Sequence, residues 1–248
     1  MGKNKLKKFD EMDRMDIVFQ YPFSVLQNEG FPLRGRWREE FFHNDNPIVL
    51  ELGCGKGEYT VGLARRFPDR NHIGIDIKGA RMWTGATEAV ADRLPNVAFL
   101  RTHIELLPHF FAPGEVDEIW ITFPDPQMKK VNKRLTGTHF LEIYRKVLAR
   151  DAKINLKTDS PFLYAYTTAM IEHNALPLLA ATADLYASSL SEQVPPIRTY
   201  YEQQWLSRGI PSKYICWTLP ADAQLEEPEV DIEPDTYRSF GRGTLQGF

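Results

Sequence analysis

The chain has 248 residues, of which 43% are apolar and 25% charged, a composition that excludes general disorder and is sufficient for one well-packed core. Its length is compatible with one α/β domain plus an arm or with two lobes. The 30 basic and 33 acidic residues give a net charge of −3, which by itself argues against a nucleic-acid partner, because phosphate-binding domains are usually strongly basic.

The number of cysteines and the length of the apolar runs indicate in which cellular compartment we expect the protein. Cys54 and Cys216 are too few for a disulfide framework, which favours a cytoplasmic location. No apolar run approaches the roughly 18 residues that a membrane span requires. The first 16 residues carry charge without an apolar segment, so we expect neither a secretory signal nor a membrane partner.

Composition divides the chain into three regions. Residues 1–46 form an N-terminal arm with little periodicity, expected to be a tail and a wrapping segment. Residues 47–220 form the body. Residues 221–248 hold seven acidic residues and two arginines, and we expect an acidic, largely disordered tail. Without that tail the chain has 28 basic and 26 acidic residues, a net charge of +2, so the distribution of charge permits a phosphate-bearing partner.

In the body, short β-branched or aromatic runs alternate with helical stretches. Helical periodicity extends over 58–67, where Tyr59, Leu63 and Phe67 share one face, and over 138–148. Strands are predicted at 48–53, 72–76, 97–101, 116–123, 152–157, 178–186 and 213–219. This alternation predicts an α/β fold with a doubly wound, mostly parallel seven-stranded sheet and helices on both faces.

The first predicted strand of the body leads into a glycine-rich loop, residues 53–57, and then a helix. This arrangement brings the backbone close to a nucleotide-like ligand. A P-loop would need Ser or Thr after Lys56, where Gly57 stands, and a dinucleotide fingerprint would need glycine where Glu58 stands. Both of these alternatives fail on spacing.

The spacing does match Glu-x-Gly-x-Gly-x-Gly followed by an acidic residue after the next strand, and this pattern resembles class I S-adenosylmethionine-dependent methyltransferases. The resemblance implies that three glycines admit the methionine part of the cofactor. It implies that Asp76 accepts hydrogen bonds from both ribose hydroxyls, a charge-assisted pair, and that Glu51 supports the loop or the amino-acid end. The glycines are Gly53, Gly55 and Gly57.

The third predicted strand ends just before His103. In the resembled fold this position lies beside the adenine, so His103 is expected either at the edge of the cofactor or on the surface. None of the six histidines has the spacing of a zinc-ligand pair, so we expect no metal.

The loop after the fourth predicted strand carries the most chemical information. Pro124-Asp125-Pro126 is followed closely by four basic residues, Lys129, Lys130, Lys133 and Arg134. In methyltransferases that act on ring nitrogens or exocyclic amines, this strand end faces the methyl group. A carboxylate there with cations around it implies a purine on a phosphate backbone, whereas such a basic run in isolation is usually a solvated face.

Four motifs in order then resemble the bacterial single-subunit tRNA (guanine-N7-)-methyltransferases. They are the glycine loop with Asp76, the Asp125 loop, residues 157–159 (Lys-Thr-Asp) and residues 199–202 (Thr-Tyr-Tyr-Glu). The resemblance implies S-adenosylmethionine as cofactor and tRNA as partner. It leaves a monomer and a homodimer open.

The family's functional residues map onto single positions of this chain. Asp125 matches the catalytic aspartate that also faces the cofactor, and Lys129 matches a substrate-contacting lysine. The basic residues Lys130, Lys133 and Arg134 are expected to contact phosphates. The guanine- and RNA-binding positions are Asp159, Thr199, Tyr200, Tyr201 and Glu202.

The loop also departs from the family pattern. Gln127, Met128, Val131 and Asn132 stand where the family usually has Trp, Pro and His. These differences concern aromatic packing and the orientation of tRNA rather than the chemistry.

Guanine N7 has a lone pair and no proton, so methyl transfer to it needs positioning and no general base. Asp125, with Asp159 or Glu202 as second acceptor, is expected to accept from N1–H and the exocyclic amine, which also discriminates against adenine. Phe123, Tyr200 and Tyr201 are candidates for stacking on the base.

The sequence leaves several alternatives open. Asp159 could instead, or also, cap a helix that starts at Pro161. The acceptor could be another RNA, a small molecule or a protein. The chain could also be a non-catalytic tRNA-binding subunit.

Overall fold

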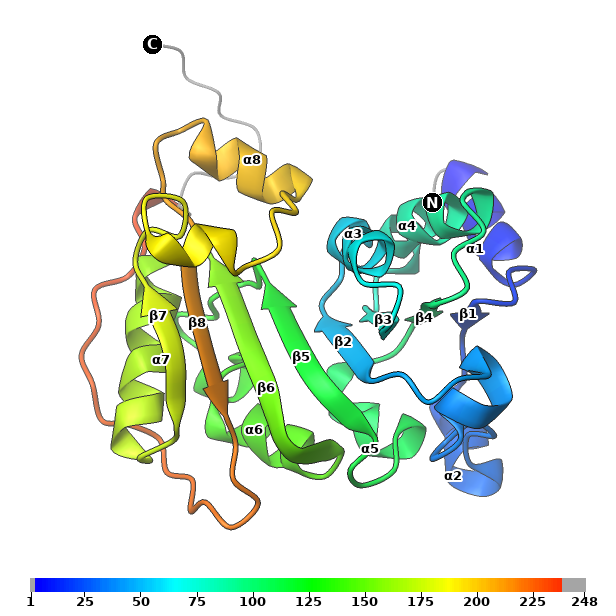
Figure 1. Cartoon of the computed structure of the whole chain (residues 1–248), viewed down its shortest axis with the longest axis horizontal. Helices are drawn as coiled ribbons and strands as arrows, with labels where there is room; N and C mark the ends of the chain where they lie inside the picture. Colours follow the sequence, from blue (N-terminus) through cyan, green and yellow to red (C-terminus); the bar gives the residue numbers. More distant parts are fainter. Residues whose placement is uncertain (1–2, 238–248) are drawn as a thin grey trace.

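The computed structural model describes residues 3–237, which build one twisted sheet with helices on both faces (Figure 1). The strand order is β1-β4-β3-β2-β5-β6-β8-β7. Neighbours from β1 to β6 in this order are parallel, and β8 is antiparallel to β6 and β7. The strands are β1 (Val18–Phe19), β2 (Ile48–Leu52), β3 (Asn71–Ile75), β4 (Val97–Leu100), β5 (Val116–Thr122), β6 (Leu148–Thr158), β7 (Leu178–Thr182) and β8 (Lys213–Thr218).

This arrangement confirms the α/β, mostly parallel doubly wound fold and all seven predicted strands, but the sheet has eight strands rather than seven. The additional strand, β1, comes from the N-terminal arm and pairs with Phe99 and Leu100 of β4. Two residues are too short to show a periodic signal, which is why the sequence did not reveal it.

The rest of the arm is also part of the folded structure. It contains α1 (Lys3–Met12), which packs on α4, then α2 (Phe23–Glu29) and a π-helical segment η1 (Trp37–Phe42). The Trp37 side chain is fully buried, and its indole N–H donates to the Phe110 carbonyl at 3.0 Å. This contact holds η1 against the short helix that ends at Phe110.

Strand alternation assigns the helices to two faces of the sheet. In β2, Leu50 points into a core shared with α5 (Leu107–Phe110), α6 (Thr138–Arg145) and α7 (Pro161–His173). The next residue towards the N-terminus, Val49, packs on the opposite face, against α3 (Glu58–Arg66). The remaining long helix, α4 (Gly79–Ala91), lies beside α3.

The carboxyl ends of the parallel strands meet at one edge of the sheet, the upper edge in Figure 1, where α8 (Tyr200–Leu206) lies over β5 and β6. Each predicted site motif before α8 directly follows one of these strands. The strand order diverges on either side of β2, since β3 lies on one side and β5 on the other. Ligands of open α/β sheets bind at such a switch point.

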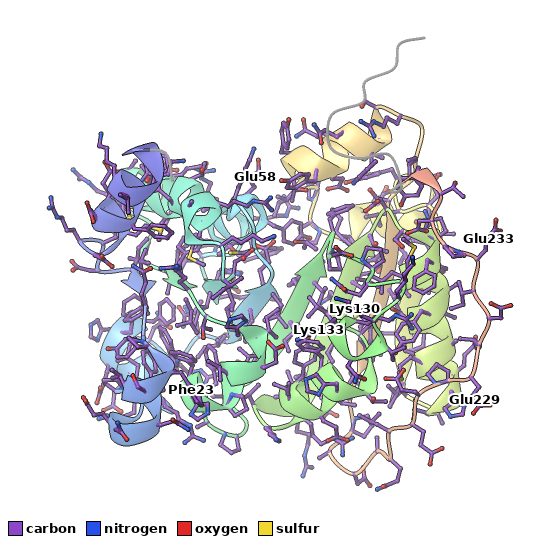
Figure 2. All side chains as sticks on the ribbon, turned by 180° about the vertical axis from the view of Figure 1, so that it is seen from behind. Phe23, Glu58, Lys130, Lys133, Glu229 and Glu233 are labelled. Carbon is purple, nitrogen blue, oxygen red and sulfur yellow. The ribbon has the colours of Figure 1, made fainter. Side chains whose placement is uncertain are left out.

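The described part of the C-terminal region, residues 221–237, runs along the outside of α7 and back to α8 (Figure 1), contrary to the expectation of disorder from composition. Glu227 accepts hydrogen bonds from the hydroxyls of Thr138 (2.7 Å) and Tyr166 (2.5 Å). Figure 2 shows Glu229 and Glu233 on the outer side of this segment. Glu227, which in the composition counts only as a negative charge, therefore anchors the segment to α6 and α7. Residues 238–248 of the predicted tail lie outside the described residues.

Candidate active site

The glycine loop combines open space with a closely packed turn. Gly53, Gly55 and Gly57 have φ angles of +77°, +57° and +75°, in the left-handed region that favours glycine. Among the described residues, a Cβ at Gly53 would meet no atom within 4 Å, whereas one at Gly57 would lie 2.8 Å from the Phe99 ring. The first glycine therefore borders open space, and the third allows the loop to pack on the sheet.

Asp76 lies against this loop although it is 21 residues further along the chain. Its Oδ2 accepts from the Gly55 N–H at 2.9 Å, and its Oδ1 accepts from the Lys78 N–H at 2.7 Å. Its partly exposed carboxylate is thus fixed at the edge of the space that the glycines border. This arrangement suits a ligand with hydroxyl donors.

Glu51 is buried below the loop. Its Oε2 accepts from the N–H (2.8 Å) and hydroxyl (2.5 Å) of Thr60, and its Oε1 accepts from the Thr122 hydroxyl at 2.5 Å. Burial raises the pKa of Glu51 to about 7. These contacts join β2, the start of α3 and the end of β5, so Glu51 supports the loop. No sequence pattern points to the two threonines, because they follow Glu51 by 9 and 71 residues.

His103 is exposed and follows the buried Thr102 at the end of β4. Its contact with the cofactor stays a prediction. Within residues 3–237 there is no group of three or more His, Cys, Asp or Glu side chains that could hold a metal ion.

The loop after β5 is held in a strained conformation. Phe123 and Gln127 have φ angles of +48° and +49°, which are uncommon for residues with a side chain. The Phe123 N–H donates to the Lys157 carbonyl at 2.8 Å, and the Asp125 carboxylate accepts from the Gln127 N–H at 3.0 Å. Asp125 itself is exposed at the carboxyl edge of the sheet.

Arg134 does not lie where a phosphate could reach it, which corrects the sequence-based expectation. Its side chain is 8% exposed and donates to the carbonyls of Gln127 (3.3 Å) and Met128 (2.9 Å). Its guanidinium carbon lies 4.8 Å from the ring centre of Phe162 and 4.3 Å from that of Tyr166. Arg134 therefore supports the Asp125 loop from inside the protein.

The three lysines of the same loop are exposed, and Figure 2 labels two of them, Lys130 and Lys133. Lys133 forms an ion pair with Glu105 at 3.1 Å, and Lys129 forms a turn together with Met128. These three lysines are placed where a phosphate could approach them.

Glu202 belongs to a buried network and not to an open binding site. It is fully buried with Lys157, whose Nζ donates to its carboxylate at 3.1 Å, while the hydroxyls of Tyr186 (2.7 Å) and Ser212 (3.0 Å) donate to its Oε1. Burial lowers the pKa of Lys157. Because its oxygens have these partners, Glu202 anchors α8 to β6, and the expected role as a guanine acceptor has no support here.

The start of α8 reaches the glycine loop. Thr199 caps this helix, accepting from the Glu202 N–H at 3.2 Å. The Tyr200 N–H donates to Glu58 at 3.0 Å, and Lys56 Nζ lies 3.8 Å from the centre of the Tyr200 ring. Figure 2 shows Glu58 next to α8.

Tyr200 and Tyr201 stay 46% and 38% exposed, as stacking on a base would require. No sequence pattern predicts the contacts of Glu58 and Lys56 with Tyr200, because residues more than 140 positions apart leave no local signal.

Asp159 is fully buried at the end of β6, and its Oδ2 accepts from the Tyr237 hydroxyl at 2.7 Å. It is not the cap of α7. That position belongs to Ser160, whose Oγ accepts from the Leu163 N–H at 2.9 Å. The predicted capping role of Asp159 was therefore wrong by one residue.

The fold, together with the glycine loop and Asp76 against it, defines a class I methyltransferase. Comparison with known proteins leads to the same class. A family model described as "Putative methyltransferase" matches residues 45–214. A solved structure titled "Crystal Structure of 16S rRNA Methyltranferase KamB" has a TM-score of 0.55 at 17% identity, covering 73% of this chain and 91% of the other. "Structure of an antibiotic related Methyltransferase" also has a TM-score of 0.55, at 18% identity, and covers 72% and 90%. These structures support the fold.

Two bacterial relatives are much closer. The Porphyromonas gingivalis protein named "tRNA (guanine-N(7)-)-methyltransferase" is 64% identical over 93% of this chain and 96% of its own length. The Bacteroides fragilis protein of the same name is 58% identical over 100% and 98%. The chain belongs to the family of tRNA (guanine-N(7)-)-methyltransferases.

An enzyme of this family uses S-adenosylmethionine, and the residues present fit it. The open space above Gly53 leaves room next to the backbone, and the Asp76 carboxylate at its edge provides an acceptor for hydroxyls. Within the described residues no helix is both long and apolar enough to cross a membrane.

Proposed function

We propose that this enzyme methylates N7 of the guanine in the tRNA variable loop. The observation that carries the proposal is the exposed carboxylate of Asp125, fixed on a strained loop directly beyond β5 with exposed lysines after it. The relatives that are 58% and 64% identical are named for guanine N7 of tRNA, which supports the same acceptor.

Methyl transfer to guanine N7 depends on positioning of the guanine rather than on proton transfer. Bound S-adenosylmethionine supplies an electrophilic methyl group on a sulfonium. Guanine N7 carries a lone pair in the plane of its ring and no proton, so an in-line displacement needs no general base. Asp125 is therefore assigned an orienting role and not that of a base.

Carboxylates act here as hydrogen-bond acceptors. Asp125 accepts from guanine N1–H or the exocyclic amine. Asp159 is proposed as the second acceptor because its Oδ2 accepts from a neutral hydroxyl, that of Tyr237, whereas Glu202 is held by the cation of Lys157 as well as by Tyr186 and Ser212. As the methyl group transfers, the purine ring gains positive charge, and fixed carboxylates stabilise that charge in the transition state.

The same contacts give selectivity. Adenine presents an acceptor at N1, where guanine presents a donor, so a carboxylate facing adenine would lose its partner. Lys129, Lys130 and Lys133 are proposed to contact phosphates, which position the RNA without reading its sequence. Tyr200 and Tyr201, both exposed, are proposed to stack on the unpaired base.

The proposal is tested by incubating the purified enzyme with labelled S-adenosylmethionine and an unmodified tRNA transcript. We expect incorporation, with chain cleavage specific for 7-methylguanine in the variable loop. A transcript with adenine at that position is the matched control and should accept no label. Label in another RNA, or none in tRNA, would contradict the proposal.

We also propose a cytoplasmic location, which the two free, buried cysteines Cys54 and Cys216 support.

A further inference from the structure

The described C-terminal residues return to the substrate side of the molecule. The Tyr237 hydroxyl donates to Asp159 Oδ2 at 2.7 Å, and the Tyr237 ring meets the Trp205 ring of α8 edge-on, with 5.2 Å between ring centres. One tyrosine thus bridges α8 and the carboxylate that the proposed function assigns to guanine.

Tyr237 reaches this place because Asp235 is firmly held. Asp235 Oδ2 accepts from the Ser160 hydroxyl at 2.5 Å and Oδ1 from the Phe162 N–H at 3.0 Å, both at the start of α7. The Asp235 N–H lies 3.1 Å from the Met128 sulfur, in the Asp125 loop. Asp235 is 5% exposed, so these contacts are shielded from water and restrict where Tyr237 can go.

These contacts also give a role to Met128, one of the positions at which the loop departs from the family pattern. Its carbonyl accepts from Arg134 and its sulfur faces the Asp235 N–H. The C-terminal segment and the Asp125 loop are therefore in direct contact.

Burial of Asp159 has a consequence for substrate binding. The residue is 0% exposed and its Oδ2 accepts from the Tyr237 hydroxyl, so a guanine N–H can reach that oxygen only when the hydroxyl leaves it. We infer that Tyr237 is a specificity residue of the substrate site. In the free enzyme its hydroxyl donates to Asp159, and when tRNA binds, a guanine N–H replaces that hydroxyl as the donor. This inference rests on the proposed guanine-binding role of Asp159.

An exchange of donors sharpens selection of the base. Guanine offers N1–H and an amine on one edge and can take over the hydrogen bond that Tyr237 gives up. Adenine presents an acceptor at N1, so displacing Tyr237 would leave the Asp159 carboxylate without that partner, which is costly in a buried site.

The first test is Tyr237→Phe, which keeps the ring against Trp205 and removes the hydroxyl. We expect KM for the tRNA transcript to fall about three- to tenfold, the range of one competing hydrogen bond, with kcat and the Kd for S-adenosylmethionine unchanged. Tyr164→Phe on α7, partly buried against the main core, is the matched control and should leave KM unchanged. A rise in KM, a fall in kcat or no change in Tyr237→Phe would overturn the inference.

The second test uses the unmodified enzyme. Hydrogen exchange of the backbone amides from Glu233 to Tyr237 is compared with and without saturating tRNA. Displacement predicts faster exchange of this segment in the complex, and unchanged or slower exchange would refute it. If N7 methylation is absent altogether, the proposed function fails. If methylation occurs but these two measurements do not change as expected, only the inference about Tyr237 fails.

Discussion

The Thr122 hydroxyl donates to Glu51 Oε1 at 2.5 Å and so connects the ends of β5 and β2 beneath the glycine loop. Glu51 is 3% exposed, so its carboxylate is shielded from water. The carboxylate relies on Thr60 and Thr122 as donors, and burial still raises its pKa to about 7. Proton uptake by Glu51 is therefore linked to folding.

Glu51→Gln should alter the pH dependence of stability. The folded-state pKa of about 7 lies above the ordinary value of 4.5, so the folded protein binds more protons between these values and the stability contributed by Glu51 falls as pH rises through this window. Relative to wild type, the variant should gain stability between pH 5 and pH 7 by at most about 1.4 kcal/mol per pH unit.

Urea unfolding of both proteins at pH 5, 6, 7 and 8 measures this difference. His72, whose pKa is lowered to about 4 by burial, gives a slope of opposite sign, but it is present in both proteins and cancels in the comparison. A difference in unfolding free energy that stays constant with pH would show that Glu51 does not titrate in this range.

Asp125→Ala should reduce turnover far more than cofactor affinity. Loss of a fixed group that stabilises developing charge lowers kcat on the order of a hundredfold. Calorimetric titration with S-adenosylmethionine should give a Kd close to that of wild type. Asp69→Ala, an exposed aspartate in the turn before β3, is the control. Equal losses of kcat and cofactor affinity would mean that Asp125 maintains the fold instead.

Lys129→Ala and Arg134→Ala should differ in the salt dependence of tRNA binding. An exposed lysine that contacts a phosphate contributes about 0.7 to 0.9 to the slope of log Kd against log salt concentration, and Lys129→Ala should lose that amount. Arg134 is buried against the carbonyls of Gln127 and Met128, so Arg134→Ala should keep the slope and lose about 1 to 3 kcal/mol of stability. Filter binding from 50 to 300 mM salt gives the slopes. A reduced slope for Arg134→Ala would show that Arg134 does contact a phosphate.

Lys157→Met should destabilise the fold by about 3 to 5 kcal/mol, because it leaves the Glu202 carboxylate buried without its cation. Lys157→Met combined with Glu202→Gln removes both charges and should recover part of this loss. Denaturant unfolding of the two single variants and the double variant measures the coupling. Strict additivity would show that the ion pair contributes nothing of its own.

The sequence by itself determined the class of fold and the edge of the sheet at which the candidate site lies. Strand runs, the spacing of Gly53, Gly55 and Gly57, and an acid after the next strand are local patterns, and parallel strands bring their carboxyl ends to one edge of the sheet. The structure accordingly places Asp76 on the Gly55 N–H and leaves Asp125 exposed beyond β5.

Tertiary structure alone decided what several of those residues do. The sequence does not distinguish a buried charged residue from an exposed one. Arg134 is buried against two aromatic rings, and Glu202 is paired with the buried Lys157. Asp159 is covered by Tyr237, 78 residues further along the chain. The physical reason is that burial and hydrogen-bond partners depend on segments far apart in sequence, whereas composition and periodicity report only on near neighbours.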